Sequence, residues 1–497
     1  MLPIALGSPG CGEGDASENR SHIIDVGSRK QLFIDDMLMD SSRGIRLTMN
    51  PPRKTGEVLI TADEPWEDGG GVRGLSATNT SILREGGLFR VWYDSLGQDY
   101  DHLGSDFRQI GYAESEDGIH FVKPSLGIVE IGGSTANNIV IRENIGGGVV
   151  WIDPRASEHE RYRSLRKTRP SGELALHSSP DGVHWTLTRT TDIGHCDTQS
   201  IAFWDDAYQC YVLYTRRWVR PPETEHAYRI FRRLESTDLV EWRNEEIVLA
   251  ADEQDLRTHD TPQGYPPVDY YGGAVFKYEE APDVYFMLAQ AFWHWHPRNG
   301  GEGWAPATMD VRLCASRDGK RFERLGHRRP FIPLGAEGEF DSRLVWAMPN
   351  PIRVGDELWI YYVGTNRDHD GFIDPAAPDG RYLGAVSRAV LRLDGFVSAD
   401  AGYAGGEIVT PPIRFEGSRL ELNVNTSGGG SVVVELLDES GAPIPGYTRQ
   451  DATPVNGSSV RMPVSWGGST DVSALSRRPI RMRLLMQDCR LYAFQFS

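Results

Sequence analysis

The stretch Ser179-Pro-Asp-Gly-Val-His-Trp185 decides the fold, because close copies of it recur along the chain. Three copies keep the Ser, the Asp and the aromatic residue: Ser115-Glu-Asp-Gly-Ile-His-Phe121, Ser236-Thr-Asp-Leu-Val-Glu-Trp242 and Ser316-Arg-Asp-Gly-Lys-Arg-Phe322. A degenerate fifth copy, Arg392-Leu-Asp-Gly-Phe396, lacks the Ser and has its aromatic residue closer to the Asp. Successive Asp residues are 57 to 80 positions apart. A repeat at a roughly constant period indicates one structural unit that is used several times.

Ser-x-Asp-Gly is a turn sequence. Its Asp side chain accepts hydrogen bonds from nearby backbone N–H groups, and its Gly adopts a positive φ without steric cost. The aromatic residue four positions after the Asp then begins the next strand and packs inward, so that the turn joins two antiparallel strands. The five Asp residues are therefore expected to be structural.

Each repeat shows the same order of four strands. A first strand and a short polar turn precede an aromatic-rich second strand; the third strand ends in the Ser-x-Asp turn, and the fourth begins at the aromatic residue. The second strands are the clearest, at residues 89–93, 162–165, 211–214, 285–288 and 359–363. Five repeats of four short strands predict an all-β fold, a five-bladed β-propeller.

The pattern of the chain changes at both ends of the repeats. Residues 1–24 are rich in Gly, Ser and acids and are expected to be disordered. Residues 25–398 are assigned to the propeller, as the catalytic domain. Residues 399–497 begin with a Gly-rich and Pro-rich connector and continue in longer alternating strands, which predict a small C-terminal β-sandwich.

Composition limits the classes of partner. The chain has 497 residues and a net charge of −18, from 52 basic and 70 acidic residues. This charge argues against nucleic acid or an anionic membrane as the main partner. No apolar run is long enough to span a bilayer. Five scattered cysteines without a Cys-x-x-Cys pair predict neither a disulfide framework nor a zinc site.

The N-terminus leaves the cellular location open. Residues 1–11 have a short apolar run before Cys11, as at the end of a lipoprotein signal, but no basic segment precedes it. One interpretation is a truncated signal of a secreted, periplasmic or lipid-anchored protein. The other is an ordinary terminus of a cytoplasmic protein.

The hairpin repeats and the appended C-terminal domain resemble the five-bladed β-propeller glycosidases: glycoside hydrolase families 32, 43 and 68 and the mannoside phosphorylases of family 130. The chain is most similar to bacterial glycosyl hydrolase family 32 N-terminal-domain-like proteins, through the segments Gln31-Leu-Phe-Ile-Asp-Asp36 and Pro65-Trp-Glu67. The resemblance covers roughly residues 25–497. It implies an exo-acting glycoside hydrolase that binds a terminal sugar of an oligo- or polysaccharide at the propeller axis and needs no cofactor. Two carboxyl groups carry such a reaction: one protonates the leaving oxygen, and the other attacks or activates water.

Four acids are the candidates for these carboxyl groups: Asp197, Asp341, Glu67 and Asp269. Families 32 and 43 place an Asp at the start of a first strand with an aliphatic residue four positions later, and Asp197 with Ile201 has this spacing. The segment Ser76–Asn79, which matches the position of the families' nucleophile or base, holds no carboxylate. The role of each acid, and retention or inversion of the anomeric centre, therefore stay open.

The expected substrate-binding residues surround these acids. They are Trp66, Gln199, His294, Arg343 and Trp346. His294 and His296 have a spacing that also occurs in metal sites, but a pair on one face of a strand is more often structural or substrate-facing, and no metal is predicted.

Two alternatives stay open beside the hydrolase. A non-catalytic carbohydrate-binding propeller would explain the missing acid in the first repeat. A glycoside phosphorylase would need a basic phosphate site, for which Arg343 is the only candidate that the sequence offers.

Overall fold

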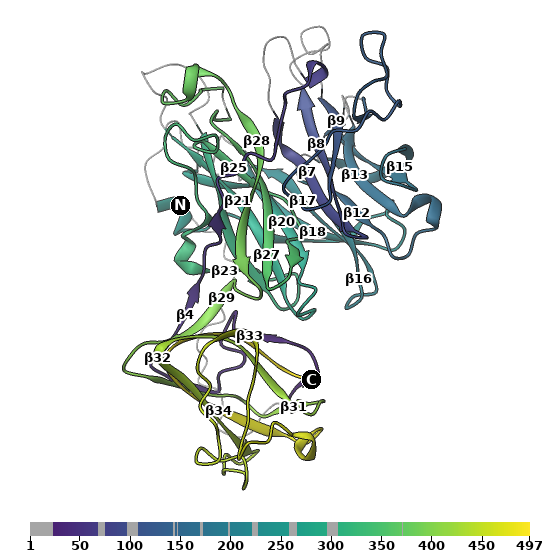
Figure 1. Cartoon of the computed structure of the whole chain (residues 1–497). Coiled ribbons are helices and arrows are strands. Elements are labelled where there is room, and N and C mark those ends of the chain that lie inside the picture. Colours follow the sequence, from purple (N-terminus) through teal and green to yellow (C-terminus); the bar gives the residue numbers. More distant parts are fainter. Residues whose placement is uncertain are drawn as a thin grey trace. The chain divides into compact units, whose positions relative to one another are not determined.

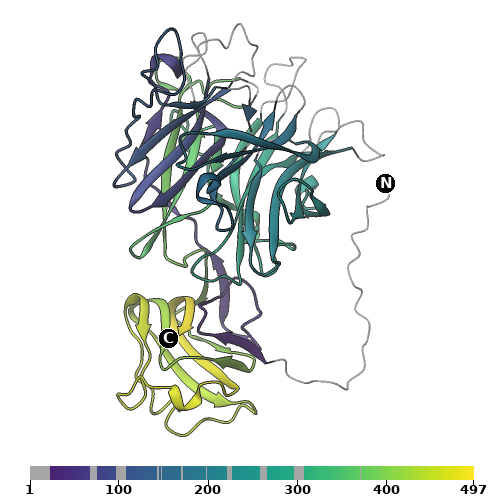
Figure 2. The same cartoon turned by 90° about the vertical axis from the view of Figure 1, so that its right-hand side faces the viewer.

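The structure of the chain is a computed structural model that describes residues 23–67, 75–96, 108–142, 145–146, 148–168, 172–196, 199–220, 227–257, 266–295, 307–369 and 371–497 (Figure 1; Figure 2). Strands dominate this part of the chain, and the helical elements in it are short 3-10 turns. The all-β class is therefore confirmed. No helix among these residues has the length and hydropathy needed to cross a membrane. The chain divides into a repeat unit, Pro51–Tyr278 with Asp283–Arg392, and a terminal unit, which holds the residues up to Asn50, Glu279–Pro282 and Leu393–Ser497.

The first three repeats each form an antiparallel sheet. The first sheet has the order β10(Ile139–Ile141)-β9(Arg108–Ser115)-β8(Leu88–Leu96)-β7(Leu75–Glu85). The second has β11(Ile145–Gly146) and β12(Val150–Ile152), both paired with β13(Tyr162–Thr168), followed by β14(Glu173–Ser179) and β15(Thr186–His195). The third has the order β16(Ile201–Asp205)-β17(Cys210–Val219)-β18(Tyr228–Ser236)-β19(Arg243–Leu249). Chain neighbours pair with each other, as hairpin repeats require.

The last two repeats are joined into one sheet by a single parallel pairing, Met309 with Leu344. The fourth repeat contains β20(Val268–Lys277), β21(Tyr285–His294), β22(Ala307–Ser316), β23(Glu323–Arg324) and β24(Pro330–Ile332). The fifth contains β25(Leu344–Ala347), β26(Ile352–Val354), β27(Glu357–Thr365) and β28(Gly384–Arg392), and β28 also pairs with β5(Arg53–Lys54) and β6(Ile60–Thr61). The aromatic second strands that the sequence predicts are β8, β13, β17, β21 and β27.

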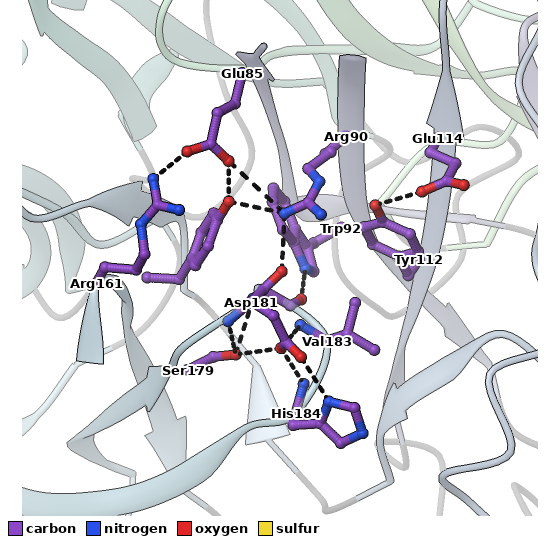
Figure 3. A network of polar contacts seen from close by, with 12 residues as sticks. Glu85, Arg90, Trp92, Tyr112, Glu114, Arg161, Ser179, Asp181, Val183 and His184 are labelled. Carbon is purple, nitrogen blue, oxygen red and sulfur yellow. Dashed lines mark hydrogen bonds and ion pairs between the residues drawn. The ribbon is translucent and has the colours of Figure 1, made fainter. Parts of the chain in front are cut away.

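The Ser-x-Asp turn has the expected hydrogen bonds (Figure 3). Ser179 Oγ accepts from the backbone N–H of Gly182 at 2.9 Å. Asp181 Oδ1 accepts from the N–H groups of Val183 at 2.9 Å and His184 at 2.8 Å. Burial would raise the pKa of Asp181, but these hydrogen bonds outweigh it and lower the pKa to about 2. The turn role predicted for this Asp is confirmed.

Each turn needs a positive φ after its Asp. Gly118, Gly182 and Gly319 have φ values of 75°, 80° and 66°, and Leu239 in the remaining copy takes 65°. Leucine rarely adopts this conformation, and here its side chain is buried in an apolar cluster, which offsets the strain.

The turns also connect neighbouring sheets. In Figure 3, Trp92 Nε1 of the first sheet donates to Gly182 O at 2.6 Å, and Arg90 donates to Asp181 O at 2.8 Å. The same contact recurs where Tyr361 of the fifth repeat donates to Gly118 O of the first at 2.8 Å. The first sheet therefore packs against both the second repeat and the last.

The fifth copy of the repeat differs from the others. Asp394 lies in the terminal unit, where its buried carboxylate is 3.0 Å from Lys30 Nζ and accepts from Asn423 at 2.9 Å. Its carboxylate thus binds side chains of distant segments.

The terminal unit holds both ends of the described chain. Its sheet is built on the pairing of β32(Leu420–Asp438) with β34(Ile480–Phe496), to which β33(Ser458–Pro463), β29(Val397–Ala401), β30(Gly406–Val409) and β31(Ile413–Phe415) are joined. The N-terminal strands β1(Ile24–Gly27), β2(Gln31–Leu32), β3(Ser41–Arg43) and β4(Ile45–Met49) pair into the same sheet. The expected boundaries are corrected accordingly, because residues 25–50 and 393–398 belong here and not with the repeats.

Candidate functional site

Asp269 lies on β20 among cationic and aromatic side chains. Its carboxylate is 1 % exposed, 3.0 Å from Arg229 Nη1 and 3.7 Å from His294 Nε2. The backbone N–H of Arg229 also donates to it at 3.1 Å. Burial raises the pKa of Asp269, but the charge of Arg229 and the contact with His294 outweigh burial and lower it. The structure therefore brings together two predicted site residues, Asp269 and His294, and keeps the acid ionised.

Glu67 follows Trp66 in the 3-10 turn Pro65–Glu67 and is fully buried. It accepts hydrogen bonds from Tyr93 Oη at 2.6 Å and from Lys123 Nζ at 2.7 Å. Burial raises the pKa of Glu67, and Lys123 counteracts part of that rise. The Trp66 indole is also engaged, because it donates to Asn138 Oδ1 at 2.8 Å. These hydrogen bonds hold the 3-10 turn Pro65–Glu67 against the first sheet.

Asp341 has a different set of partners. Its buried carboxylate is 2.6 Å from Lys54 Nζ and accepts from Tyr362 Oη at 3.0 Å. Arg343, two residues on, contacts the buried Asp374 carboxylate at 3.1 Å. The positive charge of Arg343 is therefore balanced within the protein.

The predicted acids are not in direct contact with one another in the part of the chain that the structure describes. Within the described residues, no hydrogen bond or ion pair links any two of Glu67, Asp269 and Asp341. Asp197 and His296 lie outside the described residues, as do the side chains of 76–79. Each described acid instead has its own nearby cation.

Polar side chains converge around Gly272 on β20. A Cβ atom at Gly272 would lie 2.9 Å from Gln290 Oε1, 3.3 Å from Trp346 Cζ2 and 3.5 Å from Gln199 Cβ. All three side chains are buried. Among the described residues, neither end of the Gln199 amide has a hydrogen-bond partner, and the same holds for Gln290 Oε1 and Trp346 Nε1. Buried polar atoms are normally paired, so these four atoms mark a place suited to a polar ligand or to water.

The ring of Tyr271 packs beside Gln199, Gln290 and Trp346, which together are called the amide cluster below. The ring of Tyr271 is 5.2 Å from that of Trp346, edge to face, and its hydroxyl is 3.1 Å from His369 Nε2. The guanidinium groups of Arg216 and Arg229 lie over the Tyr271 ring at 4.2 and 4.5 Å. Because Arg229 also contacts Asp269, the Tyr271 ring, the amide cluster and an ionised acid are neighbours. Tyr271 is 9 % exposed and guanidinium groups lie over its ring, so this region offers a ligand the polar atoms of the amide cluster and not an open aromatic face.

Sequence reasoning named Gln199, Trp346, Asp269 and His294 but missed Gln290. The available signal was its position as a polar residue inside the otherwise apolar run Tyr285–Ala291 of β21. Arg166 was missed too, although it alternates with Tyr162 and Ser164 on β13 and so shares their buried face of the strand.

The described residues contain no group of three or more His, Cys, Asp or Glu that could hold a metal ion. An open pocket of about 560 Å³ lies in the terminal unit, where its polar lining includes Arg46, Asp400, Asn425, Asp488 and Arg490. It contains none of the predicted site residues.

No known protein-family profile matches the sequence, and no curated protein matches it. Solved structures with a similar arrangement include an N-acetylgalactosamine deacetylase from F. plautii in complex with blood group B trisaccharide, with 14% identity, 70% of this chain and 96% of that chain covered, and a TM-score of 0.43. A β-1,2-mannobiose phosphorylase from Listeria innocua has 14% identity and a TM-score of 0.43, and the match covers 69% of this chain and 97% of that chain. A third structure comes from the GH130 family of mannoside phosphorylases, a family reported to contain glycoside hydrolases that target β-1,2 mannosidic linkages in Candida mannan. It has 15% identity and a TM-score of 0.42, and the match covers 71% of this chain and 96% of that chain.

Proposed function

We propose that the chain is a carbohydrate-active enzyme, a glycoside hydrolase that removes a terminal sugar from an oligo- or polysaccharide. The observation that carries this proposal is the amide cluster of Gln199, Gln290 and Trp346 beside the ring of Tyr271. A sugar offers hydroxyl groups that both donate and accept hydrogen bonds. The four polar atoms that lack a partner among the described residues match this requirement.

We further propose that the five repeats close into a five-bladed β-propeller with the amide cluster near its axis. Contacts between first strands support this arrangement: Gly148 pairs with Ser200, and the N–H of Val150 donates to Ser81 Oγ at 3.2 Å. The hydrogen bond from the fifth repeat to the turn of the first supports closure of the ring. The terminal unit is proposed to be a β-sandwich in which the N-terminal strands take part.

Asp269 and Asp197 are the proposed catalytic pair. Asp269 is held ionised by Arg229, as an attacking or water-activating carboxylate requires, and Asp197 lies two residues before Gln199 in the chain. Glu67 and Asp341 are proposed as positioning acids, because each is bound to a lysine and to a tyrosine hydroxyl. They hold the Trp66 turn and the Arg343 segment in place.

The test is hydrolysis of a panel of aryl glycosides and oligosaccharides by the full-length chain. Asp197→Asn and Asp269→Asn should each lower kcat at least about 100-fold, since each removes one of two groups that act together. Asp356→Asn, at an exposed acid in the repeat unit, is the matched control and should keep wild-type activity. Thermal unfolding of each variant separates lost chemistry from lost folding. Wild-type activity in both Asp197→Asn and Asp269→Asn would refute the assignment.

A non-catalytic sugar-binding protein is the second candidate, favoured by the absence of an acid from residues 76–79. It predicts that wild type binds sugars in calorimetry without turnover, and that Gln199→Ala weakens this binding.

A further inference from the structure

One face of the second sheet carries a set of buried polar groups. Tyr162, Ser164 and Arg166 are alternate residues of β13 and therefore point to the same side. His177 on β14 is the register partner of Ser164 and shares that side. The rings of Tyr162 and Trp92 are 6.1 Å apart, so this face looks toward the first sheet.

In the described part of the chain, the guanidinium of Arg166 has no hydrogen-bond acceptor. The side chain is 0 % exposed, and its Nε, Nη1 and Nη2 atoms have no hydrogen-bond partner among the described residues. His177 Nε2 and Ser164 Oγ, which are also buried, have none either. A buried charge is stable only when it is paired and hydrogen-bonded, so a guanidinium without acceptors is costly to fold. Such a cost is expected where a group serves a ligand.

Asp94 offsets this cost only in part. It alternates with Trp92 on β8, so it faces the second sheet from the first. Burial lowers the pKa of Arg166 to about 10, and the charge of Asp94 opposes that shift without overcoming it. Burial, followed by the nearby Arg166 charge, lowers the pKa of His177 to about 4, so His177 is neutral at pH 7. Arg166 and Asp94 therefore contribute one charge of each sign to this face, and no described group accepts a hydrogen bond from the guanidinium.

The stem of Arg166 lies against Gly148, which stands between β11 and β12 of the same sheet. A Cβ at Gly148 would lie 2.4 Å from Arg166 Cγ and 2.7 Å from Ser164 Oγ. Gly148 also pairs with Ser200, next to Gln199 of the amide cluster. The absence of a side chain at position 148 thus makes room for Arg166 beside a segment that pairs with Ser200, the neighbour of Gln199 in the chain.

We propose that Arg166 and Ser164 form a subsite for an oxyanion, a carboxylate or phosphate group bound through the guanidinium. The planar guanidinium binds two oxygens of such a group at once, and the Ser164 hydroxyl adds a further donor. The oxyanion has two possible sources: the carboxylate of an acidic sugar in the substrate, or free inorganic phosphate. The inference rests on the proposed function only for the identity of that source.

The experiment measures binding to the full-length chain by calorimetry and by thermal shift, without any assumed substrate. The probes are inorganic phosphate and galacturonate, with galactose as the uncharged control. Wild type should bind one of the two anions and show no comparable affinity for galactose. Arg166→Gln should weaken that binding about 10- to 100-fold, because hydrogen bonds to a charged group are worth a factor of this order. Lys167→Gln removes a positive charge from the next position of β13, on its opposite face, and should leave binding unchanged.

Arg166→Met provides a second readout. If Arg166 serves a ligand, replacing it with an apolar side chain of similar length should leave the Tm unchanged or raise it in buffer, and should abolish the anion-dependent rise in Tm. A fall in Tm in buffer would assign Arg166 a structural role and overturn the proposal. Absence of binding by both anions, or equal binding by wild type and Arg166→Gln, would overturn it as well.

The two proposals fail in different ways. Anion binding through Arg166 without turnover of any glycoside would refute the proposed hydrolase activity and support the oxyanion subsite. If Arg166→Gln hydrolyses neutral glycosides as fast as wild type does and neither anion binds, the hydrolase activity is supported and the oxyanion subsite is refuted.

Discussion

Replacing Asp374 by Asn should destabilise the repeat unit by an amount that depends on pH. The Asp374 carboxylate is buried and accepts from Ser342 Oγ at 2.6 Å and from the Gly338 N–H at 2.9 Å, and Arg343 lies 3.1 Å away. Burial alone would raise the pKa of Asp374, but these contacts outweigh it and lower the pKa from 3.8 to about 2. At 1.36 kcal/mol per pKa unit, the ionised group contributes roughly 2 kcal/mol to folding at pH 7.

The sign of the pH dependence follows from the lowered pKa. The folded state binds the proton more weakly than the unfolded state, so the contribution is complete above about pH 4 and disappears as the pH falls through about 2. About half of it should remain at pH 3. Asp374→Asn should therefore lower the free energy of unfolding most at pH 7 and progressively less below pH 4.

Urea unfolding followed by tryptophan fluorescence at pH 7, 5, 4 and 3 measures this difference. The control is Asp379→Asn, an exposed acid of the same loop, which should change the free energy of unfolding by less than about 0.5 kcal/mol. A loss for Asp374→Asn that is equal at pH 7 and pH 3 would show that the carboxylate charge is not what stabilises the fold.

Two further predictions concern buried groups of the repeat unit. Gly148→Ala should lower stability by about 1–3 kcal/mol in urea unfolding, because its Cβ would lie 2.4 Å from Arg166 Cγ, whereas Gly402→Ala, with nothing within 4 Å, should be neutral. An equal change in stability for Gly148→Ala and Gly402→Ala would mean that the segment around Gly148 can shift to accept the added methyl group. Lys123→Met should cost roughly 3 kcal/mol at pH 7, because it leaves the buried Glu67 carboxylate without its cation. Burial raises the pKa of Glu67, so its protonated form is favoured in the folded state, and this loss should shrink as the pH falls toward 4; a constant loss would contradict the reasoning.

The turns and second strands could be predicted because their causes are local. Ser179 and Asp181 bind backbone N–H groups within three residues of themselves, so the sequence alone specifies the turn. The alternation of aromatic and small residues along β8 and β17 likewise depends on strand geometry. Asp394 also lies in a turn, as its sequence predicts, but local spacing did not indicate that Lys30 and Asn423 from distant segments would bind its carboxylate.

The roles of charged residues could not be predicted in the same way. Arg343 was expected to bind substrate, but Asp374, 31 positions later, balances its charge. Asp341 is bound to Lys54, although the sequence gives no reason to pair them. The N-terminal strands were assigned to the repeats, yet β2 pairs with β34 at the opposite end of the chain. Each outcome depends on which segments meet in space, and this is not encoded in local spacing.

The copies of Ser179–Trp185 determined by themselves that the chain is all-β and built from repeated hairpins, because turn chemistry and side-chain alternation act over a few residues. Only the tertiary structure decided which polar groups are satisfied. It paired Glu67, Asp269 and Asp341 with separate cations, and it buried Gln199 and Arg166 with no hydrogen-bond partner for their side-chain polar atoms among the described residues. The physical reason is that desolvation and hydrogen-bond pairing depend on neighbours from other sheets, which the order of residues along one strand does not specify.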